Sequence, residues 1–288
     1  MHFFDALTQG LLLGGVYALF AIGLSVMFGV MRIVNLGHGD FAVLAAFVAL
    51  LFITGSAMPL WLAVLITVPV FSLLGYFLQR TLIQPSISSG PLATILVTFG
   101  LSILLQNGLQ EIFSADTRTL DAGALATASL QIGPIAVPVI GIVGLVLAIL
   151  VIALMQQFLQ RTRTGRMMRA ASDDQETARI TGADARHIYG LATAIAFASV
   201  ALAGLLFAVR SSFSPGSGTL QLIFAFEAVV IGGLGSLWGT LLGGLTLGIV
   251  QTLVAAVDPS SAILAGHVLF LIVLAFRPQG LIPSRSIA

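Results

Sequence analysis

Long uncharged runs of apolar residues constrain this chain more than any other feature of its sequence. Ordinary runs of this kind cover residues 7–28, 59–79, 91–110, 132–158, 188–209 and 263–276. About 20 apolar residues cross a bilayer as an α-helix, and only 8% of the 288 residues are charged, against about a quarter in soluble domains. The sequence therefore predicts an all-α, polytopic transmembrane helix bundle of about eight spans with discontinuous helices. A soluble globular enzyme is excluded.

Lysine and cysteine are absent from the sequence, which narrows the chemistry that this chain performs. All 12 positive charges are Arg, so no G-x-x-x-x-G-K-[ST] phosphate-binding loop exists and any ATP must bind to partner subunits. We expect no cofactor in the chain itself. Without Cys there is no disulfide, no thiolate nucleophile and no Cys-ligated metal, and we expect no metal site. A net charge of +1 indicates no nucleic-acid partner.

A short apolar run predicts a broken helix near the N-terminus. The first span, residues 7–28, follows Asp5 without any preceding Arg, so it reads as a retained span and not as a signal peptide. The next uncharged run, residues 41–54, would cover only about 21 Å of a roughly 30 Å hydrocarbon core. Two glycines flank a histidine just before it, in Asn35-Leu36-Gly37-His38-Gly39-Asp40. Since glycine is a poor helix former, we expect unwound backbone there.

A second irregular region covers residues 220–257, with Glu227 as its only charge. As one helix it would be about 57 Å long, too long for one crossing, and residues 232–236 are the expected break. Glu227 is a candidate residue of the substrate pathway, because an intramembrane carboxylate is expensive to bury. We expect it near the outer end of a discontinuous span in a structural or gating role, where backbone N–H groups freed by Gly232 and Gly233 would keep it ionised. The alternative is a hydrated residue near the outer interface. The spacing of Gly235, Gly239 and Gly243, followed by Gly244 and Gly248, predicts a helix face for close helix packing.

Arginine placement predicts the topology. Six of the 12 Arg residues lie between residues 158 and 188, so this loop is expected on the cytoplasmic side. Counting spans outward from it places Arg80, Arg277 and Arg285 inside. The acidic connection with Glu111, Asp116 and Asp121 is then outside, with Arg118 as its only Arg. The side of the N-terminus depends on how residues 32–54 cross.

Non-helical backbone at membrane depth is tolerated where protein buries it or where it lines a watery cavity. Asn35, Gly37, His38 and Gly39 are therefore candidate residues of a substrate pathway. A half-helix that begins near Gly39 would offer free N–H groups to an anionic group. The alternative is a solvated loop at the cytoplasmic interface.

A polar stripe follows the run at residues 91–110. Its members are four residues apart and share one helical face: Thr94, Thr98, Ser102 and Gln106. In lipid such a face points to protein or water, so we expect it to line the same cavity as residues 35–40. The alternative is that the hydroxyls bond to the carbonyl groups four residues back.

The arginine-rich loop contains a candidate docking helix. Ser172-Asp173-Asp174-Gln175 has the form of a capping box, and Gly182 is placed as a stop. The pattern predicts a helix over residues 173–181 that docks a soluble partner. The alternative is an amphipathic connector that touches lipid headgroups.

With these features in place, the chain resembles the permease subunits of ABC importers of the branched-chain amino acid (Liv) type. The resemblance covers nearly the whole chain and is carried by GLLLGGVYAL (residues 10–19), VNLGHG (34–39), TFGLS (98–102) and GSLWG (235–239). Residues 176–182, ETARITG, are similar to the E-A-A-x-x-x-G motif that docks in an ATPase, with Thr177 in place of the first Ala. The resemblance assigns ATPase coupling to Asp173, Asp174, Glu176, Ala178 and Gly182.

The resemblance implies one transmembrane permease domain, residues 1–288, with a coupling loop at residues 159–187. It implies two ABC ATPase subunits, a second permease subunit, homologous or identical, and a periplasmic substrate-binding protein. It implies that the protein lies in the bacterial inner membrane. It also implies that the solute is a branched-chain or other small neutral amino acid. Urea or short amides are alternative solutes, because the same permease type serves them. An ion-coupled secondary transporter that uses Glu227, Asp40 and His38 is the rival class, and a membrane enzyme has only His38 beside Asp40 in its favour.

Overall fold

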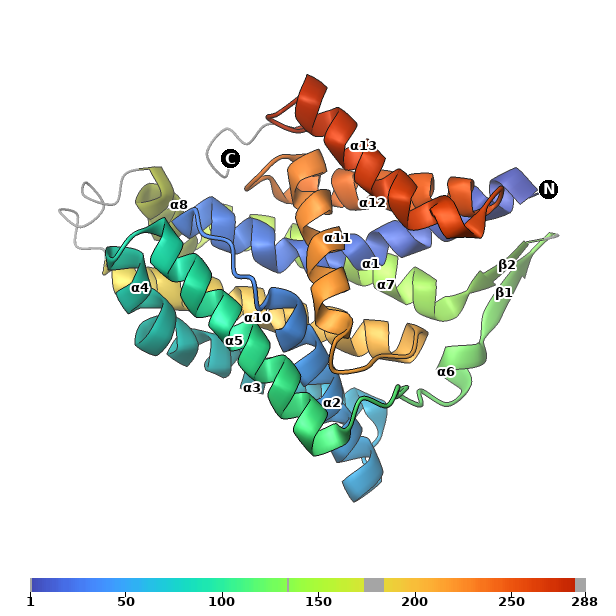
Figure 1. Cartoon of the computed structure of the whole chain (residues 1–288), viewed down its shortest axis with the longest axis horizontal. Coiled ribbons are helices and arrows are strands. Elements are labelled where there is room, and N and C mark those ends of the chain that lie inside the picture. Colours follow the sequence, from blue (N-terminus) through green and yellow to red (C-terminus); the bar gives the residue numbers. More distant parts are fainter. Residues whose placement is uncertain (1, 134, 174–183, 283–288) are drawn as a thin grey trace.

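The computed structural model describes residues 2–133, 135–173 and 184–282, and these form a helical bundle (Figure 1). Eight of the described helices are long and apolar enough to cross a membrane, and a shorter apolar helix accompanies them. The predicted all-α polytopic bundle is thus confirmed. The first half contains α1 (His2–Met31), α2 (His38–Ser56), α3 (Leu60–Leu78), the π-helical turn η1 (Gln79–Ile83), α4 (Gln84–Ser88) and α5 (Pro91–Phe113).

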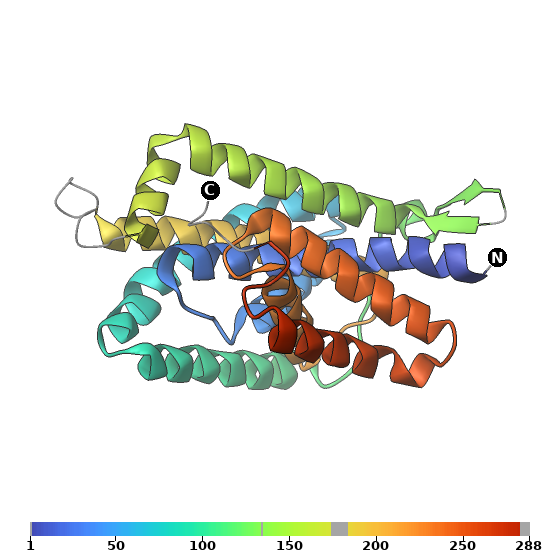
Figure 2. The same ribbon diagram turned by 90° about the horizontal axis from the view of Figure 1, so that it is seen from above.

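The second half begins with small elements and then repeats the long helices. It contains α6 (Ala124–Thr127), β1 (Ser129–Ile132), β2 (Ile135–Pro138), α7 (Val139–Arg161), α8 (Arg163–Asp173), α10 (Ala185–Arg210), α11 (Ser217–Gly232), α12 (Leu237–Ala255), the 3-10 turn η2 (Pro259–Ser261) and α13 (Ala262–Phe276). Helices α1 and α10 are the most buried, and α13 lies on the outside of the bundle (Figure 2). The large core cluster is built mainly from α1 and α10 with side chains from their neighbours.

The expected break near the N-terminus is present. Helix α1 ends at Met31, Arg32 adopts a φ of 56°, and irregular backbone leads to α2, which begins at His38. The Asn35 carboxamide oxygen accepts a hydrogen bond from the Gly37 amide at 3.0 Å. Figure 1 shows α2 beginning beside the middle of α1 and not at an end of the bundle. We call α2 the first half-helix, although at 19 residues it is longer than the 14-residue uncharged run.

The later irregular region, residues 220–257, has the single break that the sequence predicted. The expected break lies at residues 233–236, with φ values of 117° at Gly233 and 81° at Gly235. A further interruption at residues 211–216 separates α10 from α11, which has only 16 residues. Helix α11, the second half-helix, runs steeply across α1 in Figure 1.

The two half-helices belong to two copies of one arrangement. The order α1, α2, α3, α5 corresponds to α10, α11, α12, α13, and the packing is reciprocal, since α12 lies along α1 and α3 lies along α10. Gly37 and Gly216, the residues that precede the half-helices, have nearly equal φ and ψ angles of −80°, 0° and −84°, −4°. Because α1 and α10 run in opposite directions, the copies have inverted topology.

A hydrogen bond from Ser172 shows at which end of the bundle α1 terminates. The Ser172 Oγ donates to the carbonyl oxygen of Gly29 at 2.7 Å, so the end of α1 lies beside the arginine-rich loop. The N-terminus lies at the opposite end, next to β1 and β2 (Figures 1 and 2). Arg80 also lies at the loop's end of the bundle, because it contacts Tyr76, whose hydroxyl bonds His187 at the start of α10. If this loop is cytoplasmic, the N-terminus is outside.

The span expected over residues 132–158 starts later than predicted. Strands β1 and β2 pair in an antiparallel manner, and α7 begins only at Val139. Gly133 has a φ of 61°, which suits a tight turn, and Pro138 precedes the helix in extended conformation. Apolar content alone did not distinguish these strands from the helix that follows.

Candidate functional site

A buried carboxylate organises the polar residues where the first half-helix meets α5. Asp40, in the first turn of α2, is only 1% exposed. Its Oδ2 accepts a hydrogen bond from the Ser102 hydroxyl at 2.5 Å, and its Oδ1 accepts one from the Gln106 amide at 2.9 Å. Charge-assisted bonds of this kind are about twice as strong as neutral ones. The stripe on α5 therefore binds the half-helix through its last two members.

The second half-helix joins the same group of side chains. The Gln106 amide nitrogen lies 3.0 Å from the hydroxyl oxygen of Thr219, which is in the first turn of α11. Thr219 is exposed on the surface of the single chain, and Gln106 is half-buried. We call Asp40, Ser102, Gln106 and Thr219 the crossing cluster. It extends from the protein interior to the surface.

The other two members of the stripe bond locally. The Thr98 hydroxyl donates to the carbonyl oxygens of Thr94 and Ile95 in its own helix, at 3.0 and 3.1 Å. The Thr94 hydroxyl accepts a hydrogen bond from Ser86 at 3.2 Å. Both threonines are buried against protein. The alternative of bonding within the helix thus holds for Thr98, and a role in the pathway stays a prediction for both.

The residues of the first break are enclosed by protein. His38 is fully buried, and its Nε2 lies 3.0 Å from the carbonyl oxygen of Phe20 in α1. Asn35 is also fully buried. The alternative of a solvated interfacial loop is therefore wrong for His38 and for Asp40, which is 1% exposed, and Asn35 and His38 are enclosed together. They hold the start of the half-helix in place, and their contact with a solute stays a prediction.

Backbone contacts between glycines fix the crossing of the two half-helices. A Cβ atom on Gly39 would overlap the carbonyl oxygen of Gly218, and one on Gly218 would lie 2.7 Å from the Cα of Asp40. Real Cβ atoms are never this close to backbone, so only glycine fits at either position. The first turns of α2 and α11 are consequently in direct contact, which brings their free N–H groups to one place.

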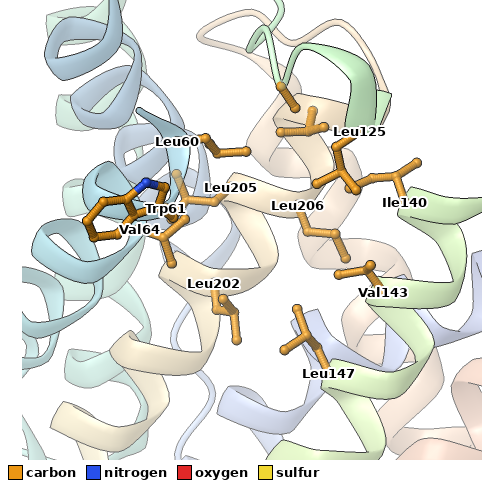
Figure 3. A pocket seen from close by; sticks show the side chains of 12 residues that line it. Leu60, Trp61, Val64, Leu125, Ile140, Val143, Leu147, Leu202, Leu205 and Leu206 are labelled. Atoms are coloured by element: carbon orange, nitrogen blue, oxygen red, sulfur yellow. The ribbon is translucent and has the colours of Figure 1, made fainter. Parts of the chain in front are cut away.

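A large cavity lies elsewhere and has a different character. Its volume is about 580 Å³, and its lining comes from α3, α7, α10 and the segment before α7 (Figure 3). The labelled side chains are all apolar except for the indole nitrogen of Trp61. None of the crossing cluster lines it. A solute with charged groups would lose its hydration there without replacement, so this cavity is not the site for a polar solute.

Glu227 has a partner that the sequence did not indicate. Its Oε1 bonds the Nδ1 of His267 on α13, while Oε2 is buried with no hydrogen-bond partner among the described residues. The expected acceptance of backbone N–H groups near Gly232 is wrong, since Gly233 donates to Val229 within α11. If the arginine-rich loop is cytoplasmic, Glu227 lies toward the cytoplasmic side and not near the outer interface, because Ile231 and Gly232 bond residues 281 and 282, which follow Arg277.

The glycine-rich helix α12 uses two faces for packing. A Cβ on Gly243 would lie 2.6 Å from the amide nitrogen of Gly232 in α11, and Gly239 contacts the same residue. Gly244 instead packs on α1, where a Cβ would lie 2.8 Å from the amide nitrogen of Ala18. Gly235 lies before α12 in the turn, so its expected place on the helix face is wrong, because its positive φ serves the break.

The predicted docking helix, residues 173–181, lies outside the described residues except for Asp173. Ser172 and Asp173 lie in the last turn of α8, so Ser172 does not cap a new helix at this point. Its hydroxyl bonds the end of α1 instead. Four of the coupling residues lie outside the described residues: Asp174, Glu176, Ala178 and Gly182.

Sequence reasoning missed Thr219 and His267. A signal for Thr219 was present, because Gly216-Ser217-Gly218-Thr219 has the same pattern as Gly37-His38-Gly39-Asp40, a glycine pair followed by a polar residue. No comparable signal marks His267. Within the described ranges, no group of three or more His, Asp or Glu side chains is placed to hold a metal ion.

Comparisons with known proteins agree on one family. The family model for the permease component of the branched-chain amino acid transport system matches residues 6–276. The high-affinity branched-chain amino acid transport system permease protein BraD of Pseudomonas aeruginosa is 31% identical, over 98% of this chain and 96% of the relative. LivH of Escherichia coli K12 is 26% identical over the same shares. LivM of the same organism is 28% identical over 93% of this chain and 68% of the relative.

Proposed function

Because the chain belongs to the family of branched-chain amino acid transport system permease components, we propose that it carries branched-chain or other small neutral amino acids across the bacterial inner membrane. It is a multi-pass membrane protein and a transport component, not an enzyme. The crossing cluster is the observation that supports a solute path through this chain. In it, polar groups of the two half-helices and α5 reach the surface at membrane depth.

The chemistry of this surface suits a small zwitterion. Asp40 is the one charged member of the crossing cluster, and Ser102 and Gln106 already donate to its carboxylate. The exposed members present a hydroxyl and an amide, Thr219 and Gln106, which donate and accept hydrogen bonds without a net charge. A solute whose charges cancel would pass such groups without strong trapping. Tight selection then belongs to a partner that delivers the solute.

We propose that a second permease subunit encloses this surface. Relatives of two kinds, LivH and LivM, both match this chain along most of its length, which supports a partner of the same fold. Two ABC ATPase subunits would supply the energy, because the chain lacks the lysine of a phosphate-binding loop. A periplasmic substrate-binding protein would deliver the solute on the outer side.

Uptake into vesicles tests the proposed function. The chain is reconstituted with its ATPases, second permease and binding protein, with ATP on the cytoplasmic side. We expect ATP-dependent uptake of labelled leucine that excess isoleucine or valine inhibits, and no inhibition by urea or acetamide. Uptake of urea but not leucine would make the chain a permease for short amides. Uptake on an ion gradient without ATP would contradict the importer mechanism.

The coupling assignment has its own test at Gly182. Replacing Gly182 by leucine is expected to reduce co-purification of the ATPase subunits at least tenfold, because a bulky side chain would obstruct the docking that the motif at residues 176–182 implies. Gly55 gives a matched control, since a Cβ there meets nothing within 4 Å, and Gly55→Leu should leave co-purification unchanged. Equal ATPase recovery with Gly182→Leu and with the unaltered chain would remove the assignment.

A further inference from the structure

Equivalent positions of the two half-helices meet at one side chain. Asp40 is the third residue of α2 and Thr219 is the third residue of α11. The Gln106 amide nitrogen lies 2.9 Å from the Asp40 carboxylate and 3.0 Å from the Thr219 hydroxyl. A carboxamide carries two N–H hydrogens, so Gln106 satisfies both half-helices at once.

The helix that carries Gln106 is loosely held in comparison with the half-helices. Gly39 and Gly218 bring the backbones of α2 and α11 into direct contact. Within this chain α5 packs mainly on α2, α4 and η1, and a Cβ on Gly100 or Gly108 would meet nothing within 4 Å. Helix α5 can therefore move as a unit against a rigid crossing, provided that the bonds of the crossing cluster break.

We propose that Gln106 and Thr219 are positioning residues for translocation: with Asp40, they hold α5 against the two half-helices and release it when the path opens. The role of the released α5 in translocation rests on the proposed transport function. The contact of Gln106 with the two half-helices does not depend on that function. The net contribution of a hydrogen bond between neutral groups changes an equilibrium constant by about fivefold. Loss of the Thr219 hydroxyl should therefore raise the population with α5 released by about this factor.

A single cysteine reports the release of α5. The chain has no Cys, and Leu109, one turn beyond Gln106, is 4% exposed and packs in a cluster with Val43 and Phe47 of α2. In the Leu109→Cys background, within the complete transporter in vesicles and without ATP, the labelling rate by a small maleimide is measured. We expect Thr219→Val to raise this rate about fivefold, and Thr219→Ser, which keeps the hydroxyl, to leave it unchanged.

A second variant tests the contact from the other helix. Gln106→Met, which keeps the length of the side chain and removes its amide, should raise the labelling rate by at least the same factor. The double variant should be no faster than Gln106→Met alone, since the Thr219 contact is already lost there. Additive increases would show that the two side chains act separately and would contradict the proposal. Should Thr219→Val reduce assembly, Gln106→Met decides the question.

Thr246 of α12 supplies the matched control. Its hydroxyl donates to the carbonyl oxygen of Leu242 in its own helix, at 2.7 Å, so Thr246→Val removes a hydroxyl without touching α5. Its labelling rate should equal that of the parent. An equal increase in Thr246→Val, or no increase in either Thr219→Val or Gln106→Met, would overturn the proposal. Labelling requires neither solute nor ATP, so a failure of leucine uptake would contradict the proposed function alone.

Discussion

Replacing Gly39 by valine is expected to abolish assembly of the permease. The Cβ atom would overlap the carbonyl oxygen of Gly218, and the amide nitrogen of Leu222 would lie 3.0 Å away. Backbone atoms on a second helix cannot move aside as a flexible side chain can, so the half-helices would separate. Overpacking typically costs about 1–3 kcal/mol, and it costs more where rigid backbone is the obstacle. The yield of monodisperse protein in detergent and its thermal unfolding midpoint measure the effect.

Gly100 provides the matched control for this substitution. It also lies inside a membrane helix, α5, but a Cβ there would meet nothing within 4 Å. Gly100→Val therefore makes the same chemical replacement in a membrane helix without the clash. We expect its yield and unfolding midpoint to stay close to those of the parent chain. A Gly39→Val protein as stable as Gly100→Val would show that α2 and α11 do not cross at these glycines.

The first break was predictable because its signals are local. Two glycines beside His38, followed by an apolar run too short for the bilayer, indicate unwound backbone from a few neighbouring residues. The crossing with α11 was not predictable in the same way. It depends on Gly218, which is 179 positions beyond Gly39 in the sequence, and only a comparison of the two Gly-x-Gly patterns would have indicated it.

The polar stripe shows what helical periodicity predicts and what it omits. Spacing by four correctly placed Thr98, Ser102 and Gln106 on a face that packs against protein. The group that each side chain bonds is determined by the tertiary structure. Ser102 reaches Asp40 on another helix, whereas Thr98 bonds its own backbone, and both serine and threonine are equally able to do either.

The capping box at Ser172 was misleading for a related reason. Ser, followed by Asp and Asp, is favourable at a helix N-terminus, but these residues are also compatible with the last turn of a preceding helix. In the fold, α8 continues through Asp173, and the Ser172 hydroxyl bonds Gly29 at the end of α1. A contact between residues 143 positions apart thus replaced the local cap.

Replacing His267 by leucine is expected to destabilise the contact between α11 and α13. The Glu227 carboxylate is buried and pairs with His267, which is partly exposed. Removing one partner of a buried pair costs about 3–5 kcal/mol when it leaves a buried group uncompensated. His267→Leu would leave the Glu227 carboxylate, which is 4% exposed, without its partner, so we expect a loss of about 3 kcal/mol. The double variant Glu227→Leu/His267→Leu should recover much of it, because no unpaired polar group remains. Thermal unfolding of the three proteins in detergent measures both effects.

Glu227→Gln separates this structural role from proton transport. The glutamine keeps the size of the side chain and an acceptor oxygen for His267 but does not exchange a proton in the physiological range. An importer driven by ATP has no need of a titrating carboxylate, so ATP-dependent leucine uptake in reconstituted vesicles should survive at a reduced rate. An imposed proton gradient should leave that rate unchanged in both proteins. Uptake that runs on the gradient without ATP, and that Glu227→Gln abolishes, would instead make Glu227 and His267 a proton relay at the contact between α11 and α13.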